Sequence, residues 1–251
     1  MKTEKLKVLD LFSGIGGFAL GLERAGLEIV GFCEVDEHAI NVLKRHWPET
    51  PIYNDIRYLD VGMLKDVDVI CGGFPCQDIS KANTKGKGLH GTKSGLWFEF
   101  FRVIKEVKPK HVLIENSANL RHRGLATILK NLHDVGYDAE WHVIPSSAFG
   151  ANHQRARLFI IAYPNTPRLQ RPILNGDSLP ISNKKEKPEF TSEGVSKWFA
   201  KWIQGLVISR DYAISQRMAR SAIKHYGNSL DPHIAQFIGS ELLKFNKEVT
   251  N

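Results

Sequence analysis

Lys7-Val8-Leu9-Asp10-Leu11-Phe12 is an apolar, strand-like run, and Ser13-Gly14-Ile15-Gly16-Gly17-Phe18-Ala19 follows it without a break. Within this stretch Gly14, Gly16 and Ala19 satisfy the pattern G-x-G-x-x-A, in which glycines let the backbone turn sharply and approach a ligand at the start of a helix. We therefore predict a strand, a tight glycine loop and a helix in immediate succession.

Glu34 stands at the end of the next strand-like run, 28–33. An acid at that position accepts hydrogen bonds from ribose hydroxyls, so with the glycine loop it predicts a site for a ribose-bearing cofactor. Nicotinamide dinucleotides and S-adenosylmethionine both carry an adenosine, so these residues do not choose between an oxidoreductase and a methyltransferase. The alternative is a tight turn without a ligand, and the correctly spaced acid argues against it.

Short β-branched runs alternate with longer amphipathic segments along the chain, the pattern of a parallel sheet covered by helices. We predict an α/β fold with a doubly wound, Rossmann-like, mostly parallel sheet. The expected strands are 7–12, 28–33, 67–71, 111–115, 139–144 and 157–162. The expected helices are 17–25, 37–47, 96–107, 127–135 and 232–245.

Regular patterns break down after residue 163, where prolines and a lysine-rich run interrupt every period. We place a small, irregular second lobe over 163–226 and predict a core formed by 1–162 together with 227–251. A helix starting near Pro232 would pack back on that core, because proline is favoured in the first turn of a helix.

The 251 residues are 42% hydrophobic and 24% charged, which is enough to bury a substantial core. No apolar run approaches the ~18 residues that span a bilayer, and the first residues lack the apolar segment of a signal peptide, so we expect a cytoplasmic protein. The net charge of +7 permits a polyanionic partner. Cys33, Cys71 and Cys76 lack the spacing of a zinc site or a disulfide framework.

Gly73-Phe74-Pro75-Cys76-Gln77 presents one cysteine on a loop after the expected strand 67–71. Open α/β sheets bind their ligands at the carboxyl ends of the strands, and a thiolate there is a candidate nucleophile. Taken alone, a buried inert cysteine is the commoner outcome. The Gly-rich segment that follows predicts either a flexible linker or a phosphate-contacting lid. Its basic residues are Lys81, Lys85, Lys87 and Lys93.

Further charged residues fall at the ends of expected strands. Glu115-Asn116 ends the strand 111–115, which places a carboxyl at the same sheet edge as Cys76 in a doubly wound topology. Arg155 and Arg157 open the strand 157–162, and alternate residues of an extended chain face the same way. Taken singly, each of these charged residues is typical of a protein surface. Together with the glycine loop and Cys76 they form a group of residues typical of an enzyme site.

Five motifs, in this order, resemble those of the cytosine-C5 DNA methyltransferases over nearly the full length outside 163–226. They are Asp10 to Gly17 for the cofactor loop, Gly73 to Gln77 for the nucleophile, Glu115-Asn116, His153 to Arg157, and Gly227-Asn228-Ser229-Leu230. The resemblance implies an S-adenosylmethionine-dependent DNA (cytosine-5-)-methyltransferase with a class I methyltransferase core.

The resemblance also implies the chemistry. Cys76 would add to C6 of a flipped-out cytosine while Glu115 acts at N3, which makes C5 nucleophilic enough to take the methyl group. Arg157 would orient the base and Glu115, with Arg155 as a second candidate. Loss of the C5 proton and expulsion of Cys76 would complete the reaction.

By the same resemblance, Asp55 and Ile56 would contact the adenine amino group and Val35 would pack on the adenine ring. The full cofactor set would be Phe12, Gly14, Gly16, Glu34, Val35, Asp55, Ile56, Pro75, Leu96, Asn228 and Ser229. The substrate set would be Gln77, Ser80, Lys81, Lys85, Lys87 and Asn116. No metal is expected. The implied partner of this monomer is double-stranded DNA in a prokaryotic or phage host cell, with a cognate restriction endonuclease as a further candidate.

The sequence departs from the family in three respects: Ser117 stands where the family usually has valine, the lobe 163–226 is short for a target-recognition domain, and the family's usual Arg-rich helix motif is not found ahead of Gly227-Asn228. The target sequence is therefore not readable. A tRNA cytosine-C5 methyltransferase would share nearly all core residues and is the main alternative. A nicotinamide oxidoreductase would have no use for Cys76 or Glu115. A nucleic-acid-binding module with an inactive site is disfavoured because Cys76, Glu115 and Arg157 are all present.

Overall fold

The computed structural model describes residues 4–64, 66–75, 95–149, 155–165, 173–174 and 230–250. Its strands are β1 (Lys7–Leu11), β2 (Glu28–Cys33), β3 (Ile52–Tyr53), β4 (Val69–Gly72), β5 (His111–Ser117), β6 (Tyr137–Pro145) and β7 (Ala156–Pro164). Its α-helices are α1 (Gly17–Ala25), α2 (Glu37–His46), α3 (Leu96–Val107), α4 (Leu120–Arg123), α5 (Leu125–Asp134) and α8 (Pro232–Thr250). Short 3₁₀ turns are η1 (Ile56–Tyr58), η2 (Val61–Met63) and η4 (Ser146–Phe149).

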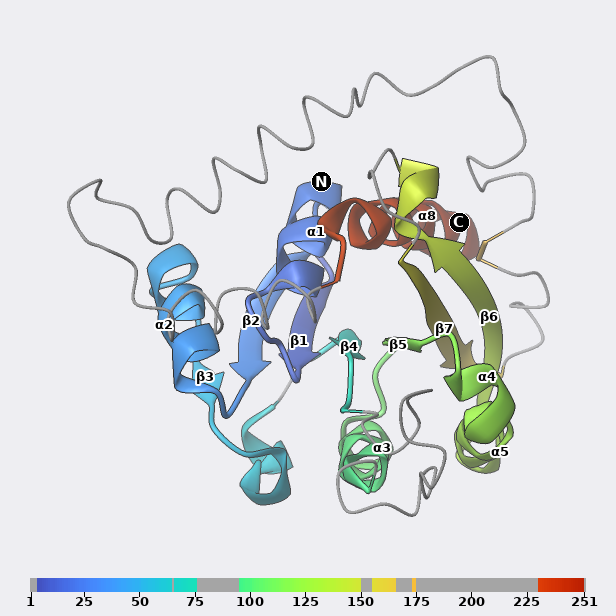
Figure 1. The fold of residues 1–251 in the computed structure, drawn as a ribbon, viewed down its shortest axis with the longest axis horizontal. Coiled ribbons are helices and arrows are strands. Elements are labelled where there is room, and N and C mark those ends of the chain that lie inside the picture. Colours follow the sequence, from blue (N-terminus) through green and yellow to red (C-terminus); the bar gives the residue numbers. More distant parts are fainter. Residues whose placement is uncertain are drawn as a thin grey trace.

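The described strands form one seven-stranded sheet in the order β3-β2-β1-β4-β5-β7-β6 (Figure 1). Strands β1 to β5 pair in parallel, and β7 runs antiparallel to both β5 and β6. The doubly wound, mostly parallel sheet is confirmed. The antiparallel hairpin has a simple cause, since the stretch between β6 and β7 is too short for the crossover that parallel strands need.

The expected strands and α-helices agree closely with the observed ones, and one strand and one α-helix were missed besides the short 3₁₀ turns. Helices α1 and α3 and strand β2 begin and end at the predicted residues. Strand β3 has two residues, too few to show an alternating pattern, and α4 has four. Helix α8 continues to Thr250, five residues beyond its predicted end.

Two apolar clusters fill the two faces of the sheet. One contains buried side chains of α1 and α8, such as Leu22 and Ile238, and the other contains buried side chains of α3 and α5, such as Phe100 and Ile128. Figure 1 shows these helix pairs on opposite sides of the strands. The sheet is thus covered on both faces, which leaves the strand ends as the place for a ligand.

Helix α8 lies directly on α1. A Cβ built on Gly21 of α1 would stand 2.3 Å from the carbonyl oxygen of Pro232, and one on Gly239 would stand 2.9 Å from the Cβ of Ala25. Only glycine allows the two backbones to approach so closely. The prediction that the chain returns to the core near its carboxyl end is in keeping with this contact.

Part of the segment assigned to the second lobe also contacts the core. Strand β7 ends at Pro164, and Ile173 and Leu174 are buried in the same cluster as α1 and α8. The backbone N–H groups of Ile173 and Leu174 donate to Glu140 Oε1 at 2.8 and 3.1 Å. The other residues of 166–229 lie outside the described part, so the lobe and its boundaries stay a prediction.

Within the described ranges, no helix is long and apolar enough to cross a membrane.

Asp10 is a buried acid in the middle of the sheet. It is 1% exposed in β1, next to Cys71 of β4, and the Cys71 thiol and the backbone of Ala19 are its polar neighbours. Burial raises the pKa of Asp10 to about 8. The group is therefore protonated in the folded protein at neutral pH, whereas it is ionised in the unfolded chain.

We expect the stability of this protein to fall as the pH rises, and Asp10→Asn to reduce that loss. Because the folded pKa lies above the unfolded value, the contribution of Asp10 is complete below about pH 4 and is lost as the pH rises through about 8. The loss is on the order of several kcal/mol. Urea unfolding midpoints measured from pH 5 to 9 should decline more steeply for the unsubstituted protein than for the variant. Parallel pH curves would contradict this assignment.

Candidate active site

The predicted site residues that the structure describes gather at one edge of the sheet. Because β1 to β5 are parallel, the segments after β1, β2, β3 and β4 and the last residues of β5 all meet at the carboxyl edge. The chain order reverses between β1 and β4, which is the switch point where such sheets bind ligands. Strand β7 is antiparallel, so its first residues lie at this same edge.

The glycine loop after β1 has the backbone that its pattern predicts. Gly14 and Gly16 have φ of 54° and 85°, in the left-handed region that glycine adopts without strain. No described atom lies within 4 Å of a Cβ built on Gly14, so the loop faces open space there. A Cβ on Gly16 would instead stand 2.7 Å from the Trp47 ring. Gly14 therefore offers the backbone to a ligand, while Gly16 makes room for the packing of α2.

Glu34 is tied to this loop by its carboxylate. Oε2 accepts a hydrogen bond from the Gly14 N–H at 2.7 Å, and Oε1 accepts from the N–H groups of Val35 and Asp36, both at 2.8 Å. Three backbone donors thus fix a carboxylate beside the loop, and its remaining lone pairs can accept from hydroxyls. Val35 follows directly and is 60% exposed, an apolar surface beside that carboxylate.

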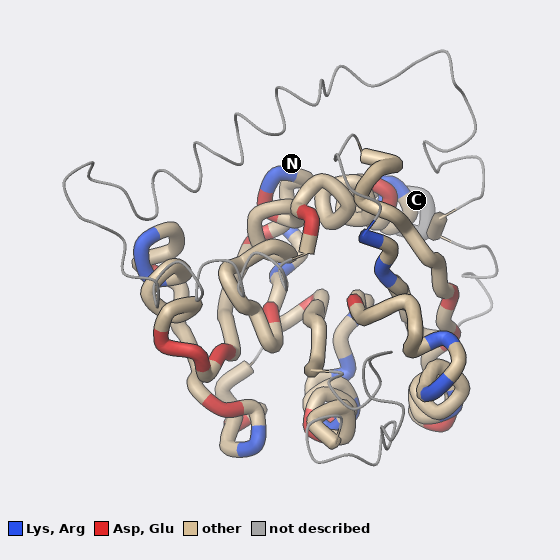
Figure 2. Tube along the Cα trace, in the orientation of Figure 1, with Lys and Arg blue, Asp and Glu red and all other residues tan. Residues whose placement is uncertain are grey.

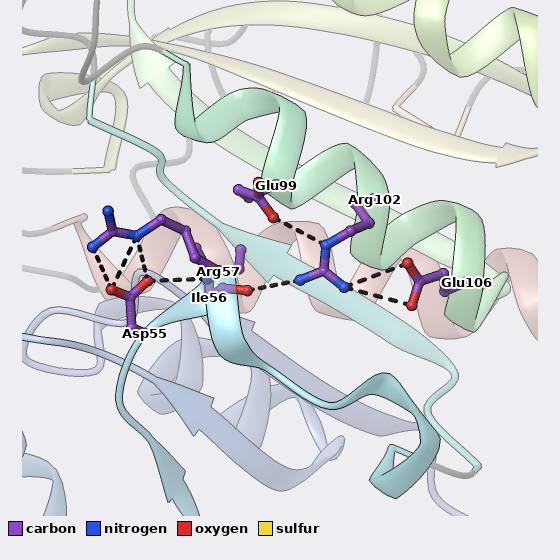
Figure 3. A network of polar contacts seen from close by, with 6 residues as sticks. All are labelled: Asp55, Ile56, Arg57, Glu99, Arg102 and Glu106. Carbon is purple, nitrogen blue, oxygen red and sulfur yellow. Dashed lines mark hydrogen bonds and ion pairs between the residues drawn. The ribbon is translucent and has the colours of Figure 1, made fainter.

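Asp55 and Ile56 form the turn after β3. The Asp55 carboxylate accepts from the Arg57 N–H at 3.0 Å and from Arg57 Nη2 at 2.6 Å, and hydrogen bonding from Arg57 lowers the pKa of this carboxyl. The Ile56 carbonyl oxygen accepts from Arg102 Nη2 of α3 at 2.8 Å. Figure 3 shows these contacts side by side. Sequence reasoning missed both arginines. The spacing of Glu99, Arg102 and Glu106 could have indicated a helical ion pair, but not its target.

Phe12 and Leu96, two further residues of the predicted cofactor set, are partly buried. Phe12 stacks on Phe100 with the ring centroids 6.2 Å apart, and its φ is 54°. Leu96 is the first residue of α3 and packs against the apolar cluster on that face. Both therefore connect the loop edge to helix α3.

The backbone that leads to Cys76 is anchored on two sides. Phe74 is buried, with its ring 5.6 Å from that of Trp97, and its carbonyl oxygen accepts from Asn116 Nδ2 at 3.1 Å. Pro75 follows and is partly buried. The segment therefore leaves β4 in a fixed direction, set by α3 and by β5.

Glu115 lies against this segment. Its side chain is 13% exposed, and its Oε1 lies 2.9 Å from Arg157 Nε. A Cβ built on Gly73 would stand 2.8 Å from Glu115 Oε2. Burial raises the pKa of Glu115, and the charges of Arg157 and Arg155 oppose that rise. The Glu115 carboxylate therefore lies between Arg157 and the backbone of Gly73, which is three residues before Cys76.

Arg155 belongs to the same charged group. Burial lowers its pKa, Arg157 lowers it further, and Glu115 and Asp231 act in the opposite direction. Asp231 precedes α8, so the returning end of the chain brings an acid to this group. Sequence reasoning missed Asp231, because its distance from the arginines along the chain gives no signal.

The two cysteines that the structure describes are poorly suited to nucleophilic attack. Cys33 and Cys71 are buried in the sheet. Burial raises the pKa of Cys33 to about 12 and raises the pKa of Cys71 well above its usual range. Their thiolates are therefore disfavoured, which leaves Cys76 as the candidate.

Several predicted site residues lie outside the described ranges. They are Cys76, Gln77, Ser80, Lys81, Lys85, Lys87, Asn228 and Ser229. Their roles stay predictions. Within the described residues Asp and Glu outnumber Lys and Arg and are interspersed with them (Figure 2). The basic excess of the chain therefore falls on the remaining segments, 76–94 and 175–229 among them.

We expect Gly73→Ala to lower the turnover of whatever reaction this site performs by at least about tenfold, with a small change in unfolding temperature. The added methyl group would displace the Glu115 carboxylate, and a misplacement of about 1 Å at a reacting group is enough for such a loss. Gly62→Ala is the matched control, since its Cβ would meet the exposed Asp60 carboxylate at 3.1 Å. Equal turnover in both variants would contradict the placement of Glu115.

The model of the C-5 cytosine-specific DNA methylase family matches residues 6–201 of this chain. Type II methyltransferase M.Eco47II of Escherichia coli is 41% identical over 165 residues, which are 63% of this chain and 39% of that protein. Type II methyltransferase M1.ScrFI of Lactococcus lactis subsp. cremoris is 36% identical over 167 residues, 64% of this chain and 42% of that protein. The chain therefore spans less than half the length of these relatives.

Among solved structures, the Entamoeba histolytica methyltransferase EhMeth superposes on this chain with a TM-score of 0.68. The superposition covers 99% of this chain and 100% of EhMeth. Its sequence identity is 15%, so this likeness concerns the fold. Near-complete coverage in both directions indicates that a methyltransferase fold accounts for the described core.

Proposed function

The chain belongs to the C-5 cytosine-specific DNA methylase family, and on that premise we propose that it transfers a methyl group to C5 of a cytosine in double-stranded DNA. The observation that carries this proposal is the Glu115 carboxyl, which is held by Arg157 against the backbone leading to Cys76. The reaction needs an acid near the nucleophile, and Glu115 is a buried acid that is paired with an arginine and lies against the segment before Cys76.

The cofactor would be S-adenosylmethionine, which supplies an electrophilic methyl group. The described residues fit it. Gly14 offers an uncrowded backbone, Glu34 is fixed where it can accept from ribose hydroxyls, and the exposed Val35 provides an apolar face for a base. Asp55 has a low pKa and remains an ionised acceptor for an amino group.

The attack on cytosine would be shared between a nucleophile and an acid. The Cys76 sulfur forms a bond to C6, and the electron pair of the C5–C6 double bond becomes available at C5. Glu115 supports this step by sharing a proton with N3, and its raised pKa favours the protonated form that can do so. Arg157 holds the carboxyl in place through its contact at 2.9 Å. After methylation, loss of the C5 proton restores the double bond and expels Cys76.

DNA binding would rest on the basic segments. Because C6 is not accessible inside a duplex, the target base must be flipped out, at a cost of a few kcal/mol. Lys81, Lys85 and Lys87 follow the nucleophile directly in the sequence and would contact phosphates, while Gln77, Ser80 and Asn116 would contact the base or its neighbours. Several relatives are named Type II methyltransferases, which supports a cognate restriction endonuclease acting on the same site. The protein would act as a monomer in the cytoplasm.

The test is transfer of labelled methyl groups from S-adenosylmethionine to mixed-sequence duplex DNA and, in parallel, to bulk tRNA, with Cys76→Ala as the blank. Incorporation into DNA that disappears in the variant would support the proposal. Incorporation into tRNA alone would replace it with tRNA cytosine-C5 methylation, and no incorporation into either would reject it for the isolated chain.

A further inference from the structure

The turn that carries Asp55 and Ile56 is joined to helix α3 by one side chain. Arg102 lies on α3 and donates from Nη2 to the Ile56 carbonyl oxygen at 2.8 Å (Figure 3). The hydrogen bond of the 3₁₀ turn to the same oxygen, from the Leu59 N–H, is longer at 3.3 Å. The contact from Arg102 is therefore the shorter of the two, and its donor is charged.

Arg102 is itself held in position. Its Nε donates to Glu99 Oε2 at 2.9 Å and its Nη1 lies 3.4 Å from Glu106 Oε1. Buried side chains on the opposite face of α3, including Trp97 and Phe100, fix the helix against the sheet. Two acids thus hold two of the guanidinium nitrogens and leave the third directed at Ile56.

Arg102 and the Asp55 carboxylate both bind the peptide unit between Ile56 and Arg57. The carbonyl of Ile56 and the N–H of Arg57 belong to the same planar peptide bond. That N–H donates to Asp55 Oδ1 at 3.0 Å, while the carbonyl accepts from Arg102. A rotation of this peptide plane would move both contacts, so Arg102 restrains the carboxylate as well as the backbone.

The ion pair on the other side of Asp55 comes from Arg57. Its Nε donates to both Asp55 oxygens at 3.1 Å and its Nη2 donates to Oδ2 at 2.6 Å. The Arg57 side chain is 60% exposed, whereas that of Arg102 is 32% exposed. Arg57 therefore holds the carboxylate directly, and Arg102 holds the peptide unit whose N–H donates to it.

We propose that Arg102 is a positioning residue that orients the Asp55 carboxylate and so gives this protein its preference for a base with an amino group. The inference rests on the proposed function, in which Asp55 accepts from the adenine amino group of the cofactor. A carboxylate fixed in place attracts an amino group and repels a carbonyl oxygen, so adenine should be preferred over hypoxanthine.

The test compares binding of S-adenosylhomocysteine with binding of its deaminated analogue, S-inosylhomocysteine, by titration calorimetry. The unsubstituted protein should prefer the adenine compound by at least about tenfold. Arg102→Ala should reduce that ratio severalfold, and Arg102→Lys should restore little of it, because one ammonium group cannot reproduce the guanidinium fork. Lys130→Met is the control, since it removes an exposed helical ion pair with Asp134 and should keep the full preference.

The selectivity ratio separates this role from a general loss of structure, which would weaken both ligands equally. An unchanged ratio in Arg102→Ala would overturn the proposal, and so would equal binding of the two compounds by the unsubstituted protein. In both cases the proposed methyltransferase function would stand, because the adenine compound still binds. Failure of the unsubstituted protein to bind S-adenosylhomocysteine would reject the proposed function and this inference with it.

Discussion

Cys76→Ala should abolish methyl transfer to DNA and leave the binding of S-adenosylmethionine unchanged. Without the sulfur no bond forms at C6, and C5 of cytosine is too weak a nucleophile to take the methyl group. Most of the described cofactor residues lie on the loops after β1, β2 and β3, away from this substitution in the sequence; Pro75 precedes Cys76 directly and keeps its own side chain. Methyl transfer and cofactor affinity should therefore be measured on the same preparation.

Cys33→Ser is the control for this variant. Cys33 is buried and burial raises the pKa of its thiol to about 12, so it is no substitute for Cys76. The control should methylate at a normal rate if it folds. Duplex DNA with 5-fluorocytosine gives a second measurement, because the adduct has no C5 proton to lose and stays attached to the protein. A stable adduct with Cys76→Ala would show that another residue is the nucleophile.

Glu115→Gln should lower kcat by a factor of about 100 or more, with a smaller effect on DNA binding. Glutamine has nearly the same shape but does not deliver a proton to N3, and a well-placed acid contributes about two to four orders of magnitude. The substitution also leaves Arg157 without its carboxylate partner at 2.9 Å. The measurement is single-turnover methyl transfer at saturating DNA and S-adenosylmethionine.

Glu241→Gln is a closely matched control for the second variant. Glu241 is 14% exposed and pairs with Lys244 at 2.7 Å, whereas Glu115 is 13% exposed and pairs with Arg157. Both substitutions remove a mostly buried carboxylate that pairs with a basic side chain, but Glu241 lies on α8 and is not among the predicted site residues. If both variants keep normal turnover, Glu115 has no part in the chemistry.

The local structure of this protein could be read from its sequence with high accuracy. Helix α3 was predicted to its first and last residue because Phe100 and Ile104 recur at helical spacing and Pro109 follows. Strand β3 was missed because two residues carry no period. The antiparallel direction of β7 was also not specified, since a strand's sequence pattern does not state which way its neighbour runs.

The site was predictable as a set of residues but not as an arrangement. The motifs identified Glu115 and Arg157, yet their ion pair depends on β7 lying antiparallel to β5, which brings Arg157 opposite Ser117. The crowding of Glu115 against Gly73 likewise depends on the parallel pairing of β4 with β5. These contacts join residues about 40 positions apart, and no local pattern encodes them.

The sequence by itself determined the alternation of strands and helices, the glycine loop and the residues that carry the chemistry, because backbone propensity and side-chain periodicity act over a few neighbouring residues. The tertiary structure alone decided the environment of those residues. It buried Asp10 in the middle of the sheet, placed Arg157 on Glu115 and joined Arg102 of α3 to Ile56. Strand order and register set these contacts, and they arise from packing the whole chain at once.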